Sequence, residues 1–154
     1  MKSIQNWLDE YGVSHTHPTN KTIHWICVPL IFFSITGLLY TVEIPTDIYN
    51  GIRINLAHIM LFAVTIYYAT LSRTLWIGML LFGLLCVAAC YAIVSSGLPL
   101  WLVCVVIFVL AWIGQFYGHK LEGKKPSFLK DLQFLMIGPA WLMSFIYQRL
   151  GITL

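Results

Sequence analysis

Four of the five histidines in this chain lie in two short polar stretches whose residue types suit metal binding. The first stretch holds His15, His17 and His24 within ten residues, and the second holds His119. Neutral imidazole is the commonest metal ligand in proteins. Two or three histidines with one carboxylate suit non-haem Fe(II), Mn or Zn, and a facial set leaves open positions for substrate and dioxygen. A metal site would form if the fold brought the two stretches together.

The spacing of the first stretch predicts the start of a helix. Asn20 and His24 are four residues apart, so on a helix they would share one face. His15 and His17 come just before Pro18, a residue favoured in the first helical turn. The first stretch therefore predicts a loop that carries two imidazoles and leads into a helix that carries a third.

In the second stretch, two further polar residues are expected on the same helical face as His119, one on each side of it in the sequence. Gln115 precedes His119 by four residues and Glu122 follows it by three, so all three would lie on that face. Glu122 is a candidate catalytic residue, either as a metal ligand or as a hydrogen-bond partner of a ligand. Asn20 and Gln115 are further catalytic candidates, because a carboxamide can orient a liganding imidazole through its other ring nitrogen.

A single histidine at a membrane interface is usually a solvated side chain without further function. We accept that interpretation for His17 and for His58, which lies inside the opposite end of the second apolar segment described below. We predict that His15, His24 and His119 are metal ligands, because ionisable groups rarely gather without function at one end of membrane-spanning segments.

The composition is that of an integral membrane protein. The 154 residues are 59% hydrophobic and only 10% charged, against about 25% charged residues in typical soluble domains. Residues 22–42, 54–72 and 74–119 contain no Asp, Glu, Lys or Arg. A helix that crosses a bilayer needs about 20 mostly apolar residues. The length allows one domain.

We therefore predict an all-α fold, a multi-pass transmembrane bundle of about five helices preceded by a short amphipathic helix. Pro45 and Asp47 indicate a turn, and a second turn at residues 95–99 divides the longest apolar run. The last helix is interrupted at residues 138–139, so a tilted or interfacial position remains an alternative to spanning. A single membrane domain over residues 1–154 would have spans near 22–41, 52–71, 75–94, 100–117 and 128–150.

The amphipathic helix is expected at the N-terminus. Ile4, Trp7, Leu8 and Tyr11 recur at helical spacing, and Gly12 is a plausible stop. Such a helix would lie on the membrane surface. It contains acidic residues and has no apolar core of its own, so it is not a cleavable signal peptide.

Basic residues predict the orientation, because they favour the cytoplasmic side of a membrane. With the N-terminus and both histidine stretches in the cytoplasm, only Arg53 and Arg149 fall outside. The membrane would be the inner membrane of a bacterium or the endoplasmic reticulum of a eukaryote. Lys124 and Lys125 would contact anionic lipid headgroups, at about 1 kcal/mol each, or bind a substrate carboxylate. The lipid bilayer is thus an expected partner, and nucleic acid is not.

The cysteines are expected to be structural. Cys27, Cys86, Cys90 and Cys104 all fall in apolar segments. We interpret them as small buried hydrophobic side chains, neither disulfide-bonded nor metal-binding.

Two motif blocks resemble those of the 2-hydroxy fatty acid dioxygenase family, small membrane proteins with a fungal member in phytosphingosine breakdown. The resemblance extends from about Trp7 to Leu150. Relatives generally carry Asn or Asp where this chain has His17, and the fungal form has one more residue between the later histidine and its acid. The two blocks are the pattern His15-x-x-Pro18-x-Asn20-x-x-x-His24 with Cys27-Val-Pro29, and Gln115-Phe-x-Gly-His119 with Glu122 and Pro126.

The resemblance implies an Fe(II)-dependent dioxygenase that shortens a long-chain 2-hydroxy fatty acid by one carbon, with dioxygen as co-substrate and CO₂ as product. The substrate tail would lie among the spans and its polar head near His15, His24 and His119. Two other classes remain open on the residues alone: a metal-dependent lipid hydrolase using Zn-bound water, and a non-enzymatic small membrane transporter or assembly protein.

Overall fold

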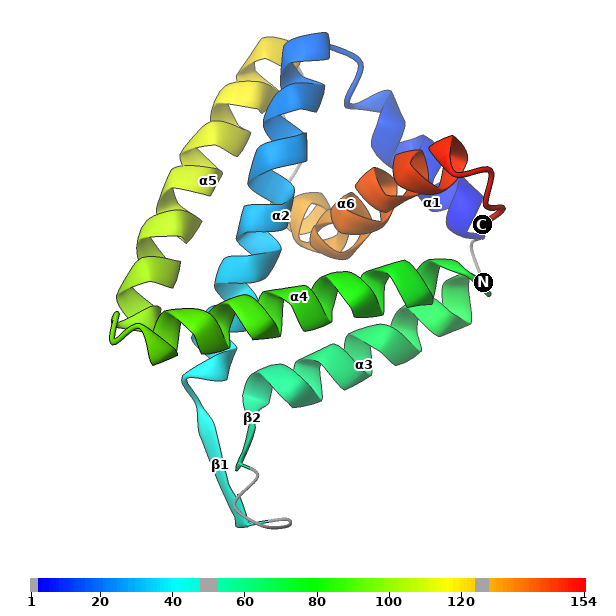
Figure 1. Ribbon diagram of the computed structural model, residues 1–154. Helices are drawn as coiled ribbons and strands as arrows, with labels where there is room; N and C mark the ends of the chain where they lie inside the picture. Colours follow the sequence, from blue (N-terminus) through cyan, green and yellow to red (C-terminus); the bar gives the residue numbers. More distant parts are fainter. Residues whose placement is uncertain (1–2, 48–52, 124–127) are drawn as a thin grey trace.

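The computed structural model describes residues 3–47, 53–123 and 128–154, and these residues are predominantly helical (Figure 1). The predicted helical class is confirmed: a short N-terminal helix is followed by five longer ones. The helix boundaries lie within five residues of the predicted ones. The elements in chain order are α1 (Ile4–Val13), α2 (Pro18–Tyr40), β1 (Glu43–Asp47), β2 (Arg53–Asn55), α3 (Leu56–Leu71), α4 (Leu75–Ser95), α5 (Leu100–Glu122) and α6 (Phe128–Arg149).

The predicted start of the second span was wrong. Residues Arg53–Asn55 form β2, which pairs antiparallel with β1, and Pro45 and Asp47 belong to β1 rather than to a turn. Asn55 then caps α3: its side chain accepts a hydrogen bond from His58 N, and His58 Nδ1 accepts one from Asn55 N. Such a capping box fixes where a helix begins, and hydropathy alone does not detect it.

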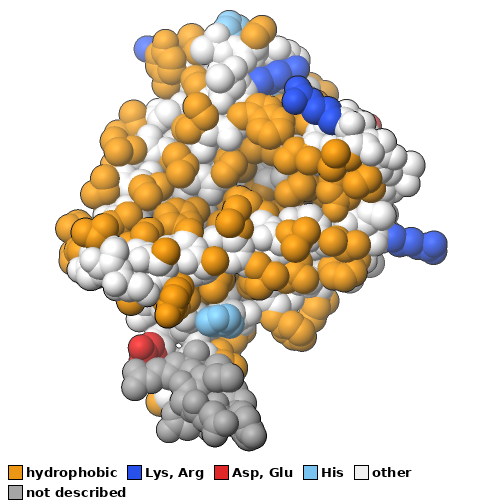
Figure 2. All heavy atoms as spheres, viewed as in Figure 1, with side chains coloured by type: hydrophobic (Ala, Val, Ile, Leu, Met, Phe, Trp, Pro, Cys, Tyr) orange, Lys and Arg blue, Asp and Glu red, His pale blue; other side chains and the backbone are white. Residues whose placement is uncertain are grey.

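Three helices in the described part of the chain are long and apolar enough to cross a membrane: α2, α4 and α5. Helix α3 is apolar but has 16 residues, which gives it a length of about 24 Å, short of a hydrocarbon core of about 30 Å. The face shown in Figure 2 is covered largely by hydrophobic side chains. On α5 alone, Val106, Leu110, Ile113 and Phe116 are exposed. These features indicate association with a membrane.

Helices α2 and α5 run side by side in opposite directions, while α3 and α4 form a pair that lies across them at one end (Figure 1). Two glycines of α5, at i and i+4, allow close approach. A Cβ on Gly114 would lie 2.7 Å from Cys27 Sγ, and one on Gly118 would lie 2.3 Å from Asn20 Oδ1. Small residues at this spacing let membrane helices pack closely. This packing brings the start of α2 beside the end of α5.

Helix α1 has the predicted amphipathic face and ends one residue beyond Gly12. Its buried residues, Ile4, Leu8 and Tyr11, pack in one hydrophobic cluster with Ile137 and Trp141 of α6. This packing fixes the direction in which the chain leaves α1 for the loop before α2. All four cysteines are buried and free, as expected of small buried side chains.

Candidate metal centre

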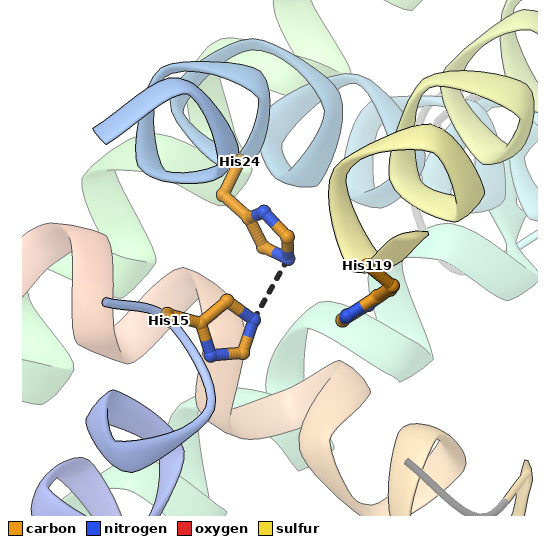
Figure 3. A group of neighbouring side chains, drawn as sticks. All are labelled: His15, His24 and His119. Atoms are coloured by element: carbon orange, nitrogen blue, oxygen red, sulfur yellow. Dashed lines mark hydrogen bonds between the residues drawn. The ribbon is translucent and has the colours of Figure 1, made fainter. Parts of the chain in front are cut away.

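His15, His24 and His119 meet at one end of the α2–α5 pair (Figure 3). Each offers one ring nitrogen, and these three nitrogens lie within 4.8 Å of one another. His15 comes from the loop after α1, His24 from the second turn of α2, and His119 from the last turns of α5. The side chains of His15 and His24 are 2% and 1% exposed. The structure thus brings together residues more than ninety positions apart in the sequence.

Backbone carbonyls orient two of the imidazoles. His15 Nδ1 lies 2.6 Å from the carbonyl oxygen of Tyr11, and His24 Nδ1 lies 2.9 Å from that of Asn20. A carbonyl oxygen only accepts hydrogen bonds. These partners therefore assign the tautomer in which the hydrogen is on Nδ1 of each ring. In a neutral imidazole the other nitrogen, Nε2, then presents a lone pair. The two Nε2 atoms are only 2.9 Å apart.

Two lone pairs facing each other at this distance repel unless a cation lies against both. A metal bound by imidazole at about 2.0–2.1 Å can be shared only by nitrogens within about 4.2 Å of each other, and the Nε2 atoms of His15 and His24 satisfy this limit. Hydrogen bonding of the second ring nitrogen to a carbonyl is the usual arrangement of metal-binding histidines. His15 and His24 therefore fit a shared metal ion, and His119 offers a third nitrogen within 4.8 Å of theirs.

The loop histidine is held in its neutral, metal-binding form. Burial lowers the pKa of His15 to about 4, and the hydrogen bond to the Tyr11 carbonyl opposes this shift only in part. The Tyr11 ring stacks on the imidazole with centroids 4.1 Å apart and planes 10° from parallel. At neutral pH no proton has to leave His15 before a metal binds.

Glu122 lies apart from the three-imidazole group and binds the loop that carries His15. Its carboxylate accepts hydrogen bonds from Thr16 N at 2.6 Å, Thr16 Oγ1 at 2.5 Å and His17 N at 3.0 Å. It also accepts one from Asn20 Nδ2 at 3.0 Å. Both carboxylate oxygens are therefore engaged, and the contacts join the end of α5 to the start of α2.

Asn20 is fully buried and joins α2 to α5. Its backbone carbonyl, rather than its side chain, orients His24. Its side-chain nitrogen donates to Glu122, and its Oδ1 has no hydrogen-bond partner and faces Gly118. The sequence singled out the residue but could not tell which of its groups contacts the imidazole.

An apolar cavity opens at the imidazoles and, with its mouth, encloses about 890 Å³. From His24 its wall follows α2 as far as Ile35, a rise of about 16 Å for eleven residues. Met60 and Val64 of α3 contribute to the lining, as do Leu135 and Met136 of α6. Gln115, which is 4% exposed, also lines the cavity.

The remaining candidates lie elsewhere. His17 is the N-cap of α2, where its Nδ1 accepts a hydrogen bond from Thr19 N. His58 is exposed and belongs to the α3 capping box. Both side chains are exposed, as expected of solvated histidines. Lys124 and Lys125 lie outside the described residues. Thr16 was not predicted as a site residue, and its position between His15 and His17 was the available signal in the sequence.

The fold and this site define a helical, membrane-associated protein with a three-histidine candidate metal centre above an apolar cavity. The model of the family described as "2-hydroxy-palmitic acid dioxygenase Mpo1-like" matches residues 1–150. The chain is also 31% identical over 151 residues to 2-hydroxy-palmitic acid dioxygenase MPO1 of Saccharomyces cerevisiae, covering 96% of this chain and 82% of the yeast protein. It belongs to the Mpo1-like family, as the motif blocks predicted. No solved structure matches it significantly.

Proposed function

We propose that this protein is an Fe(II)-dependent dioxygenase that carries out α-oxidation of long-chain 2-hydroxy fatty acids. The observation that supports this best is the convergence of His15, His24 and His119 at the mouth of an apolar cavity. The reaction balances without an external reductant: a 2-hydroxy acid and O₂ give the acid one carbon shorter, CO₂ and water. The yeast relative's name, 2-hydroxy-palmitic acid dioxygenase, describes a substrate of this class.

The three histidines would hold the iron, and the cavity would hold the substrate. Bound Fe(II) would supply Lewis acidity and electron transfer between the 2-hydroxy acid and dioxygen. The walls formed by Val28, Phe32 and Met60 would bind the acyl tail, at about 0.8 kcal/mol for each CH₂ buried. The same walls exclude water from the polar head. A 2-hydroxycarboxylate is suited to this site because its hydroxyl and carboxyl oxygens can approach one ion together.

The other candidates have supporting roles in this proposal. Glu122 would keep the His15 loop in place through its hydrogen bonds to Thr16 and His17. Asn20 would fix the start of α2 against α5. Lys124 and Lys125 would contact lipid headgroups or the substrate carboxylate as it enters.

We further propose a multi-pass topology with the N-terminus and the metal centre on the cytoplasmic side. The antiparallel α2–α5 pair supports this, because it brings both histidine stretches to one end (Figure 1). Single cysteines at the exposed positions Ser3 and Lys120, in a background without the native cysteines, should react with an impermeant maleimide from the same side. Labelling from opposite sides would contradict the topology.

The function is tested by metal analysis of anaerobically purified protein together with 2-hydroxypalmitate turnover. We expect one equivalent of iron, O₂ consumption and a product one carbon shorter. Bound zinc with ester hydrolysis and no O₂ uptake would identify a lipid hydrolase instead. Protein that binds no metal under these conditions would favour a transporter or assembly protein.

A further inference from the structure

The cavity wall contains a buried carboxamide that no described residue satisfies. Gln115 is 4% exposed, yet its side chain makes no hydrogen bond to any residue in the described ranges. A carboxamide offers two donors and one acceptor, and burial without partners is unfavourable. Because the side chain lines the cavity, a bound molecule can supply the missing partners.

A role in orienting the imidazoles does not explain why Gln115 is buried at this position. The Nδ1 atoms of His15 and His24 are already bonded to the carbonyls of Tyr11 and Asn20. No hydrogen bond joins Gln115 to His119, although the two are one turn apart on α5. Gln115 therefore has no partner among the candidate ligands, and its polar atoms are available to the cavity.

Trp112 lines the cavity one turn before Gln115, but its indole Nε1 is enclosed and does not reach the cavity surface. The cavity-lining residues in the described part of the chain include no Lys or Arg. An anionic head bound here would be met by N–H donors and by the metal.

We infer that Gln115 binds the polar head of the 2-hydroxy fatty acid, its carboxylate and 2-hydroxyl. This inference rests on the proposed function and deepens it. Gln115 is the recognition element for the acid, while the apolar walls contact only the tail. A carboxylate accepts stronger hydrogen bonds than a neutral hydroxyl does, so this wall favours the acid over a neutral lipid with the same tail.

The test measures ligand binding to chelator-treated, metal-free protein, so that neither iron nor turnover contributes. The ligands are 2-hydroxypalmitate and hexadecane-1,2-diol, which share the tail length but differ in charge. In Gln115→Leu we expect the affinity for the acid to fall about 10- to 100-fold and that for the diol about 2- to 10-fold. Gln115→Glu should weaken acid binding further through repulsion between like charges.

The matched control is Gln148→Leu, the same substitution at an exposed position of α6, which should bind both ligands as the unmodified protein does. Iron content of each variant before chelation reports whether the histidine site has folded. Equal losses for acid and diol in Gln115→Leu, or no loss for either, would overturn the inference while leaving the proposed function intact. Failure of the unmodified protein to bind 2-hydroxypalmitate, with or without iron, would refute the proposed function, and this inference with it.

Discussion

Replacing Glu122 with alanine should weaken iron binding without abolishing it. Four donors contact this carboxylate: Thr16 N, Thr16 Oγ1, His17 N and Asn20 Nδ2. Because Glu122 is partly exposed, water can replace part of each contact, and we take the low end of the usual range, about 0.5 kcal/mol per hydrogen bond. The sum is about 2 kcal/mol.

If this free energy holds the His15 loop in its metal-binding position, its loss reduces iron affinity by about 30-fold. The assay is anaerobic Fe(II) titration, with turnover of 2-hydroxypalmitate measured at saturating iron. We expect Glu122→Ala to regain most of its turnover when iron is in excess. Thr16→Val, which removes one hydroxyl but keeps the backbone N–H, should lower iron affinity only about twofold. A Glu122→Ala protein that binds no iron at any concentration would show that Glu122 is itself a ligand and that the positioning argument is wrong.

Three further substitutions test the cavity, the outlying histidine and the helix packing. Met60→Trp should fill part of the cavity and shift the preference toward shorter 2-hydroxy acids, by about fourfold in kcat/KM for each methylene excluded; an unchanged chain-length profile would remove Met60 from the tail site. His58→Ala should keep its iron and most of its turnover, because His58 only caps α3; metal loss measured by elemental analysis would refute this. Gly118→Ala should destabilise the protein by about 1–3 kcal/mol, since its Cβ would lie 2.3 Å from Asn20 Oδ1; a thermal midpoint equal to that of the unmodified protein would contradict the close packing of α2 and α5.

The sequence predicted the helices and the convergence of the histidines because both depend on local signals. Pro18 marked the start of α2, and the charge-free runs defined the long helices. The two stretches were expected at one membrane face, and the antiparallel packing of α2 and α5 brings His119 to the end where His24 lies. These inferences need only periodicity and chain direction.

The sequence could not reveal contacts that depend on tertiary packing. Asn55, which caps α3, lies in a run without charged residues. The hydropathy of that run therefore placed the start of the predicted span too early, within the strand β2. The hydrogen bonds between Thr16 and Glu122 join residues 106 positions apart, and helical spacing carries no information about such a pair. Likewise, Gln115 faces a cavity rather than an imidazole because of how α6 and α3 close the space beside α5.

The central claim is that three histidines form one iron site at which dioxygen cleaves a 2-hydroxy acid. Its most direct test uses 2-hydroxypalmitate labelled with ¹³C at the carboxyl carbon, added with O₂ to iron-loaded protein. The measurement is the ratio of ¹³CO₂ released to O₂ consumed, in the unmodified protein and in His119→Ala. We predict a ratio of about one for the unmodified protein, following the balanced reaction above. We predict no bound iron and no ¹³CO₂ for His119→Ala, because the two remaining imidazoles cannot hold the metal. A His119→Ala protein that retained its iron and released ¹³CO₂ at the unmodified rate would contradict the account.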